Sequence, residues 1–184
     1  MQILTLENDI LRQKANPVKE IGPEYLKIAE DLVSSLHAGK GIGLAGPQVG
    51  LQERIFAIHV EGDVPRIFIN PSIIETSQDT MKYEEGCLSI PGIYTDVVRP
   101  KSVKVQARNE KGRPFTLEAS GIVARVILHE YDHLEGILFI DRISEQKRNR
   151  ILEKIEKAAV RSSGRNTVQK SEPRPAPRIA GEKA

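Results

Sequence analysis

The chain has 184 residues, 39% of them hydrophobic, and a formal net charge of +2. That length suits one domain with a core of ordinary size, and no apolar run approaches the roughly 20 residues that a transmembrane helix needs. The stretch from Arg161 onward holds six basic and two acidic residues, so its charge is +4 and the preceding body carries −2. These numbers exclude a strongly basic nucleic-acid-binding domain. The first residues do not resemble a signal peptide, so a cytoplasmic protein without membrane contact is expected.

The first half of the chain predicts one helix followed by short strands. Apolar residues recur at helical spacing between Pro23 and Gly39, which suit the start and the end of a helix. The glycine-rich residues 41–50 cannot form a regular helix, and they predict an exposed loop or an interrupted strand. Strands broken by prolines are expected at 54–60, 66–69, 72–75, 102–108 and 114–118, the last two pairing through a turn at 109–112.

Two further helices and a tail complete the prediction. The second helix is expected from Gly121 to Leu134, with Ser120 as its N-cap, and a third spans 144–160 with one apolar face. Residues 162–184 are rich in serine, proline and basic residues, which predicts a disordered tail after a single domain at 1–161. The expected fold class is α+β, with the second helix packed against short, mostly antiparallel sheets and the C-terminal helix on the outside.

The clearest chemical signal is the sequence HEYDH at residues 129–133. Residues four apart on a helix share a face, so His129 and His133 would point at one spot, as two ligands of a zinc-type site do. Glu130 beside them could reach a metal-bound water. Alone, the pattern is equally consistent with a solvated helix face that carries two histidines. The apolar residues before it, including Ile122 and Val126, indicate instead that the histidines face a core or a cleft.

A third ligand has three candidate positions. Phe139 stands where one class of proteases with this motif has a third histidine, which excludes that class. Glu153 lies far enough downstream for a second class, but its helix is rich in charge and predicts solvent exposure. Cys87 is the single cysteine, so it cannot form an internal disulfide. Its thiolate would be a good ligand for divalent iron or zinc.

Three segments resemble the motifs of bacterial peptide deformylases, in the same order and with similar spacing. They are GIGLAGPQ at 41–48, EGCLS at 85–89 and HEYDH at 129–133. The resemblance covers about residues 1–160. It implies a single metal held by Cys87, His129 and His133, with Fe²⁺ expected and Zn²⁺, Ni²⁺ or Co²⁺ as substitutes. It also implies hydrolysis of the formyl group of N-formylmethionyl peptides, which releases formate.

The resemblance further assigns roles to individual residues. Glu130 would be the general acid and base, and the Gln48 side-chain amide and the Leu88 N–H would stabilise the oxyanion. The peptide would pair with Ile42, Gly43 and the carbonyl of Gly86. Ile42, Ile122 and Val126 could form the wall of a methionine pocket, although each is equally consistent with a core position.

Three residues depart from the family pattern, and two histidines lie outside it. Gly46 replaces the usual alanine and is expected to loosen its loop, and Leu128 replaces a frequent glutamine and would remove a hydrogen bond. Arg125 is expected to reach solvent rather than narrow the pocket. His37 at a helix end and His59 in a strand are interpreted as structural.

Three other functions remain open from the residues. They are a zinc endopeptidase with an acidic third ligand, a metal-binding protein without catalysis, and a transient ribosome contact through the basic tail. A tail without a partner is favoured over that contact.

Overall fold

The computed structural model describes residues 1–166, and these fall into two units. The first unit, Met1–Glu145, contains the described strands and the helices α1 (Glu24–Ala38) and α2 (Gly121–Leu134). The second begins at Gln146, and its described part belongs to the helix α3 (Glu145–Asn166). None of the described helices is long and apolar enough to cross a membrane.

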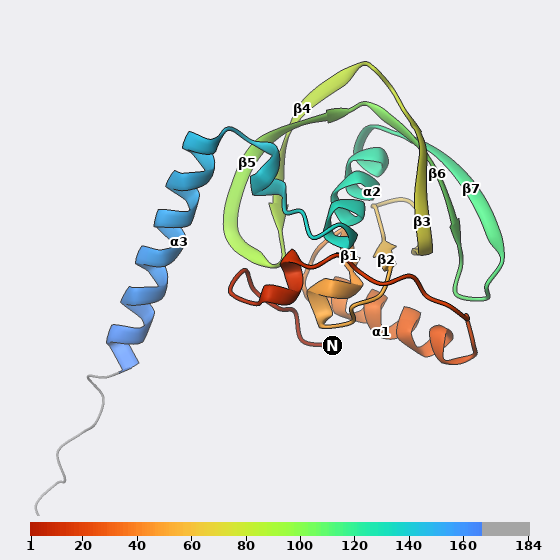
Figure 1. Ribbon diagram of the computed structural model, residues 1–184, viewed down its shortest axis with the longest axis horizontal. Coiled ribbons are helices and arrows are strands. Elements are labelled where there is room, and N and C mark those ends of the chain that lie inside the picture. The colour runs from red at the N-terminus through yellow and green to blue at the C-terminus, as the bar shows by residue number, and fades with distance from the viewer. Residues whose placement is uncertain (167–184) are drawn as a thin grey trace, which may run out of the picture. The chain divides into compact units, whose positions relative to one another are not determined.

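The strands of the first unit form two antiparallel sheets (Figure 1). The larger sheet has the order β1-β2-β3-β6-β7, and its strands are β1 (Gly43–Ala45), β2 (Ile55–Ile58), β3 (Arg66–Thr76), β6 (Ser102–Arg108) and β7 (Pro114–Ser120). The smaller sheet pairs β4 (Thr80–Cys87) with β5 (Ile90–Pro100). Three short 3₁₀ helices lie between these elements: η1 (Asp9–Arg12), η2 (Gly46–Val49) and η3 (Phe139–Arg142).

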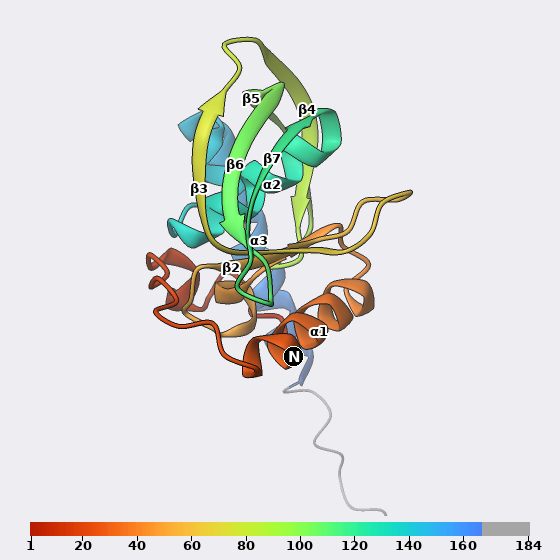
Figure 2. The same cartoon turned by 90° about the vertical axis from the view of Figure 1, so that its right-hand side faces the viewer.

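The two faces of β1 and β2 bury different helices. Successive side chains of a strand point to opposite faces. Leu44 and Ala57 therefore join the apolar cluster around α1, whereas Ala45 and Phe56 join the cluster around α2. The helix α2 also contacts β5, β6 and β7. Figures 1 and 2 show it between the smaller sheet and the β6–β7 end of the larger one.

The structure confirms the α+β fold and the three helices predicted from periodicity. The bounds of α2 agree with the sequence prediction, and β6 pairs with β7 through the turn at 109–112 as expected. Ser120 is the N-cap residue of α2, but its side chain makes no capping hydrogen bond. The predicted C-terminal helix is present and continues to Asn166, past the predicted boundary at residue 161. The rest of the predicted tail, from residue 167, lies outside the described residues.

Several strand predictions were wrong in their bounds or missed a strand. Of the two alternatives for the glycine-rich stretch, the interrupted strand is confirmed by β1, which η2 follows directly, whereas the exposed loop was wrong because Leu44 to Gln48 are buried. Pro71 does not end a strand: β3 continues through it with a shift of register between Ile69 and Ser72. The strands β4 and β5 were not predicted, although Cys87 is the last residue of β4.

Candidate metal centre and active site

The three predicted metal ligands meet at one point. One ligand atom from each of Cys87, His129 and His133 lies within 4.8 Å of the others. Both histidines come from one face of α2 and are buried, and Cys87 ends β4 and is half-buried. Its Sγ lies 3.3 Å from Nε2 of His133. Glu153, the alternative ligand, is exposed and pairs with Lys157 on its own helix.

The donor set fits a divalent metal ion. One thiolate and two imidazoles are the soft and borderline donors that Zn²⁺ and Fe²⁺ accept, and three protein ligands leave a position for a reacting molecule. His129 donates from Nδ1 to Oε2 of Glu85 at 2.9 Å, which leaves its Nε2 lone pair for a metal. Oε2 of Glu130 is buried beside these donors without a hydrogen-bond partner. A carboxylate oxygen held in this way is suited to a reacting water.

Burial and neighbouring charges shift the pKa values of the site in different directions. Burial raises the pKa of Glu130 to about 7, so this carboxyl can both accept and release a proton near neutral pH. Burial and the nearby His129 lower the pKa of His133 well below its usual value. Burial also acts to lower the pKa of His129, but Cys87 and Glu85 outweigh it and raise that pKa. The negative charge of Cys87 and Glu85 that favours a proton on His129 would equally favour a metal cation at its Nε2.

A buried network of ion pairs holds Glu85, the hydrogen-bond partner of Nδ1 of His129, in place. Arg99 donates from Nε and Nη2 to the two oxygens of Glu85, at 2.6 and 3.0 Å. It also donates from Nη1 to Asp132 at 2.7 Å, and Asp132 accepts in addition from Arg142. Glu85, Arg99 and Asp132 are each about 5% exposed. The network joins β4, β5, α2 and η3, so the orientation of His129 depends on all four elements.

The prediction that Arg125 reaches solvent was wrong. Its side chain is 4% exposed and donates to Oε1 of Glu85 and to the carbonyl of Val97, both at 2.9 Å. A third hydrogen bond, from Nη2 to the carbonyl of Met81, is 2.5 Å long. Arg125 therefore ties α2 to both strands of the smaller sheet, and a charged residue is stable there because it has a carboxylate and two carbonyls as partners.

Gln48 is held with its amide nitrogen toward the metal ligands. Its Oε1 accepts from the backbone N–H of Ala45 at 2.7 Å, which fixes which end of the amide faces the site. Its Nε2 then donates to Sγ of Cys87 at 3.4 Å and to Oγ of Ser89 at 3.2 Å. The side chain is 1% exposed, so it is not a surface amide.

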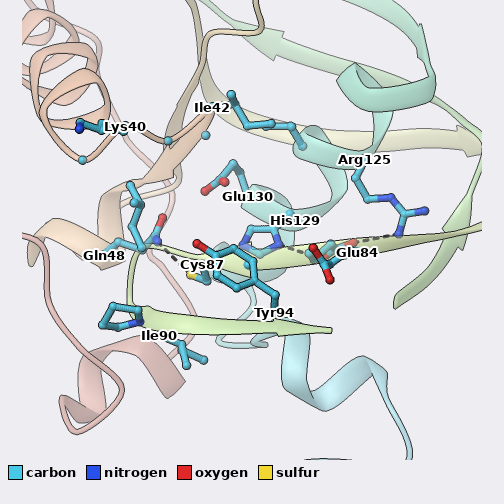
Figure 3. A pocket seen from close by; sticks show the side chains of 18 of the residues that line it. Lys40, Ile42, Gln48, Glu84, Cys87, Ile90, Tyr94, Arg125, His129 and Glu130 are labelled. Atoms are coloured by element: carbon cyan, nitrogen blue, oxygen red, sulfur yellow. Dashed lines mark hydrogen bonds and ion pairs between the residues drawn. The ribbon is translucent and has the colours of Figure 1, made fainter. Parts of the chain in front are cut away.

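A pocket of about 520 Å³ opens beside these residues (Figure 3). All five predicted substrate-binding residues line it, together with Leu88, Gln48, Cys87, His129 and Glu130; the five are Ile42, Gly43, Gly86, Ile122 and Val126. Ile42 and Ile122 are about 40% exposed, whereas Val126 is buried. In Figure 3 the side chain of Glu130 lies between Ile42 and His129. The pocket therefore combines an apolar rim with the polar groups of the site.

Gly43 and Gly46 both lie close to other atoms of the chain. A Cβ at Gly43 would lie 2.2 Å from Oε1 of Glu130 and 2.7 Å from Val126. A Cβ at Gly46 would lie 2.7 Å from the carbonyl oxygen of Leu51, a backbone atom. Gly46 is buried against this backbone, and the loosening of its loop stays a prediction. Leu128 is half-buried and packs on the core around α2.

We expect Gly43→Ala to lower hydrolytic activity roughly 100-fold, because the new methyl group displaces the Glu130 carboxylate. Metal content should not change, since the three atoms nearest to the new group belong to Glu130 and Val126 and not to a candidate ligand. Gly22→Ala is the matched control: there a Cβ meets only the flexible side chain of Glu24. Steady-state rates of both variants check this, and equal activity in the two would contradict the placement of Glu130.

The sequence reasoning missed the residues that support the ligands. Glu85 and Asp132 lie inside the two ligand-bearing motifs, so their acidic character was a usable signal. The sequence near Arg99 and Arg142 did not indicate their role. Arg99 reaches these carboxylates because β5 pairs with β4, and Arg142 reaches Asp132 because η3 lies beside α2. Phe139, which excluded one protease class, stacks on His129 with ring centroids 6.0 Å apart.

A buried carboxylate next to a Cys-His-His donor set in an open pocket is the arrangement of a mononuclear metallohydrolase. The chain matches the polypeptide deformylase family over residues 1–149. The peptide deformylase of Neisseria meningitidis serogroup C (strain FAM18) is 44% identical over 159 residues, which cover 85% of this chain and 95% of that one. The peptide deformylase of Synechococcus sp. (strain CC9605) is 43% identical over 150 residues, 79% of this chain and 75% of that one.

Solved structures give the same result. The peptide deformylase of Thermus thermophilus superposes with a TM-score of 0.81 at 38% identity, covering 86% of this chain and 95% of that one. The peptide deformylase of Synechococcus elongatus, solved in complex with actinonin, has a TM-score of 0.80 at 40% identity, covering 85% and 88%. The chain therefore belongs to the peptide deformylase family of enzymes.

Proposed function

We propose that this enzyme removes the N-formyl group from formyl-methionine at the N-terminus of nascent polypeptides and releases formate. The observation that carries the proposal is the partnerless oxygen of Glu130, buried beside three convergent donors inside an open pocket. Cys87, His129 and His133 would hold one divalent metal, and Fe²⁺ is the ion that the resemblance favours. When bound, the metal would acidify water and polarise the formyl oxygen.

The residues of the chain have distinct tasks in this reaction. Water adds to the formyl carbon, and Glu130 accepts the proton that the water loses. Glu130 then delivers this proton to the amine nitrogen as the C–N bond breaks, which gives formate and a free N-terminus. The pKa of about 7 suits both steps. The Nε2 amide of Gln48 and the N–H of Leu88 would donate to the oxyanion, and the bond from Ala45 holds Gln48 in place beforehand.

The peptide would bind as an added strand. The strand β1 is at the edge of its sheet, since β2 is its single partner there. A peptide can therefore pair with Ile42 and Gly43 on one side and with the carbonyl of Gly86 on the other. Its methionine side chain would enter between Ile42, Ile122 and Val126. We also propose that actinonin, which a relative binds, occupies this pocket.

Cys87→Ala separates this proposal from a zinc endopeptidase with an acidic third ligand. We expect the variant to hold metal at this site much more weakly and to lose its hydrolytic activity, because the thiolate is one of the three protein donors and the negatively charged one among them. Glu153→Gln is the matched control and should keep both, since Glu153 is exposed on α3. Metal analysis and activity on formyl-Met peptides check the pair. Loss of metal in Glu153→Gln with retention in Cys87→Ala would favour the endopeptidase.

A further inference from the structure

Two histidines outside the active site face each other with their ring nitrogens. Nε2 of His37 lies 2.7 Å from Nδ1 of His59, and the ring centroids are 4.9 Å apart. His37 is exposed in the last turn of α1, and His59 is half-buried just after β2. The sequence analysis interpreted both as structural, and placed His59 within a strand. Neither interpretation predicts that the two side chains converge.

The hydrogen bonds define which nitrogen carries each proton. Nε2 of His59 lies 3.0 Å from the backbone carbonyl of Asp63, an acceptor, so this nitrogen carries the proton. In the neutral ring, Nδ1 of His59 then has a free lone pair, which accepts from Nε2 of His37. A backbone carbonyl that fixes the far nitrogen of an imidazole is the same arrangement that orients histidines in metal sites. His59 is therefore preorganised as a ligand.

The C-terminal end of α1 and the Asp63 carboxylate place negative charge near the pair. His37 lies at the C-terminal end of α1, where the helix dipole is negative. The Asp63 carboxylate interacts electrostatically with His59, although it is also paired with Arg66 at 2.8 Å. Neutral imidazole is the form that binds a metal cation, and His37 needs only to move its proton from Nε2 to Nδ1 to offer a second lone pair.

We propose that His37 and His59 form a second binding site for a divalent late first-row cation, Zn²⁺ being the probe of choice, with water completing the coordination. Bonds of about 2.0–2.1 Å at tetrahedral angles place two nitrogens roughly 3.3 Å apart. The two rings must therefore separate by roughly 0.6 Å from their present contact. The exposed position of His37 at a helix end allows that movement.

The site flanks a segment that lines the catalytic pocket. Residues 39–42 connect α1 to β1, and all four line the pocket. The backbone N–H of Lys40 donates to the carbonyl of His37 at 3.0 Å, and that of His59 donates to the carbonyl of Ile42 at 2.9 Å. A cation on both rings would join the two ends of this segment. Its binding depends on neither the metal at Cys87 nor the proposed reaction.

Equilibrium dialysis of the enzyme with Zn²⁺ already at Cys87 tests the proposal. Wild type should take up a second Zn²⁺ per chain. His37→Asn and His59→Asn should each weaken the binding of this second Zn²⁺ and leave the first unchanged. We expect the affinity to fall by more than roughly tenfold, because removing even a hydrogen-bond partner of a metal ligand costs about that much. Glu61→Gln changes an exposed residue close to His59 in sequence and should bind as wild type does. Retention of the second Zn²⁺ by both histidine variants would overturn the site.

Nitrogen NMR of the wild-type imidazoles gives a test that needs no variant. Added Zn²⁺ should shift the resonances of Nε2 of His37 and Nδ1 of His59, and move the proton of His37 to its Nδ1. Unchanged resonances at Zn²⁺ concentrations that saturate the second binding would place the ion elsewhere and refute the proposal. Absence of a second Zn²⁺ in wild type would refute it equally.

Discussion

Glu130→Gln should reduce formate release from a formyl-Met peptide by about 100- to 10,000-fold while the metal stays bound. The amide keeps the size of the carboxyl group but cannot accept the proton of the attacking water. It does not alter the metal ligands, because the donor atoms belong to Cys87, His129 and His133. Metal content and formate release should be measured on the same preparation.

Glu84→Gln is the control for this variant. Glu84 lines the same pocket but is exposed, and its neutralisation should leave the rate within a factor of a few of wild type. A protein that lacks catalysis and only binds metal would show no difference between the two variants. Full activity in Glu130→Gln, at any metal content, would show that Glu130 is not the general acid and base.

Glu85→Gln should lower the free energy of unfolding by about 3–5 kcal/mol, because it removes the carboxylate partner of buried Arg125 and one of the two carboxylate partners of buried Arg99. Arg99 and Arg125 both pair with Glu85 and are about 5% exposed. The same change removes the acceptor of Nδ1 of His129, so metal affinity should fall roughly 10- to 100-fold. Asp132 also pairs with Arg99, so that guanidinium keeps one carboxylate partner in the variant.

Urea unfolding at fixed metal content measures the first effect, and competition with a chelator measures the second. Glu84→Gln is again the matched control, since it is the adjacent residue with an exposed side chain, and its stability should change by less than about 0.5 kcal/mol. Equal stability of the two variants would show that the buried network contributes little. Lower stability with unchanged metal affinity would show that the network stabilises the fold but does not orient His129 for metal binding.

The helices could be predicted from the sequence because their signals are local. In α2, nine of the fourteen residues are buried, and the bounds follow from Ser120 and from the glycine just past the end. The strands β4 and β5 could not be predicted in this way. Side chains of β4 are mostly exposed or half-buried, and β5 contains Pro91 and ends at Pro100. Their pairing with each other gives them a stability that neither sequence shows alone.

The convergence of the three candidate ligands was predictable, but the residues that support them were not. Cys87, His129 and His133 follow from residue chemistry, helical spacing and the family resemblance, and the structure brings all three together. Arg125 was misjudged because a lone arginine in a sequence predicts exposure, whereas its partners lie on two strands that the sequence did not reveal. The contact between His37 and His59 likewise requires knowledge of how α1 meets β2.

The most direct test of the central claim is formate release from a formyl-Met peptide by protein purified without oxygen, with its metal content measured on the same sample. We expect formate in amounts equal to the free amine, from protein that holds about one divalent ion at Cys87, His129 and His133, and no release after the ion is removed. Protein that contains this metal but leaves formyl-Met peptides intact would contradict the proposed function.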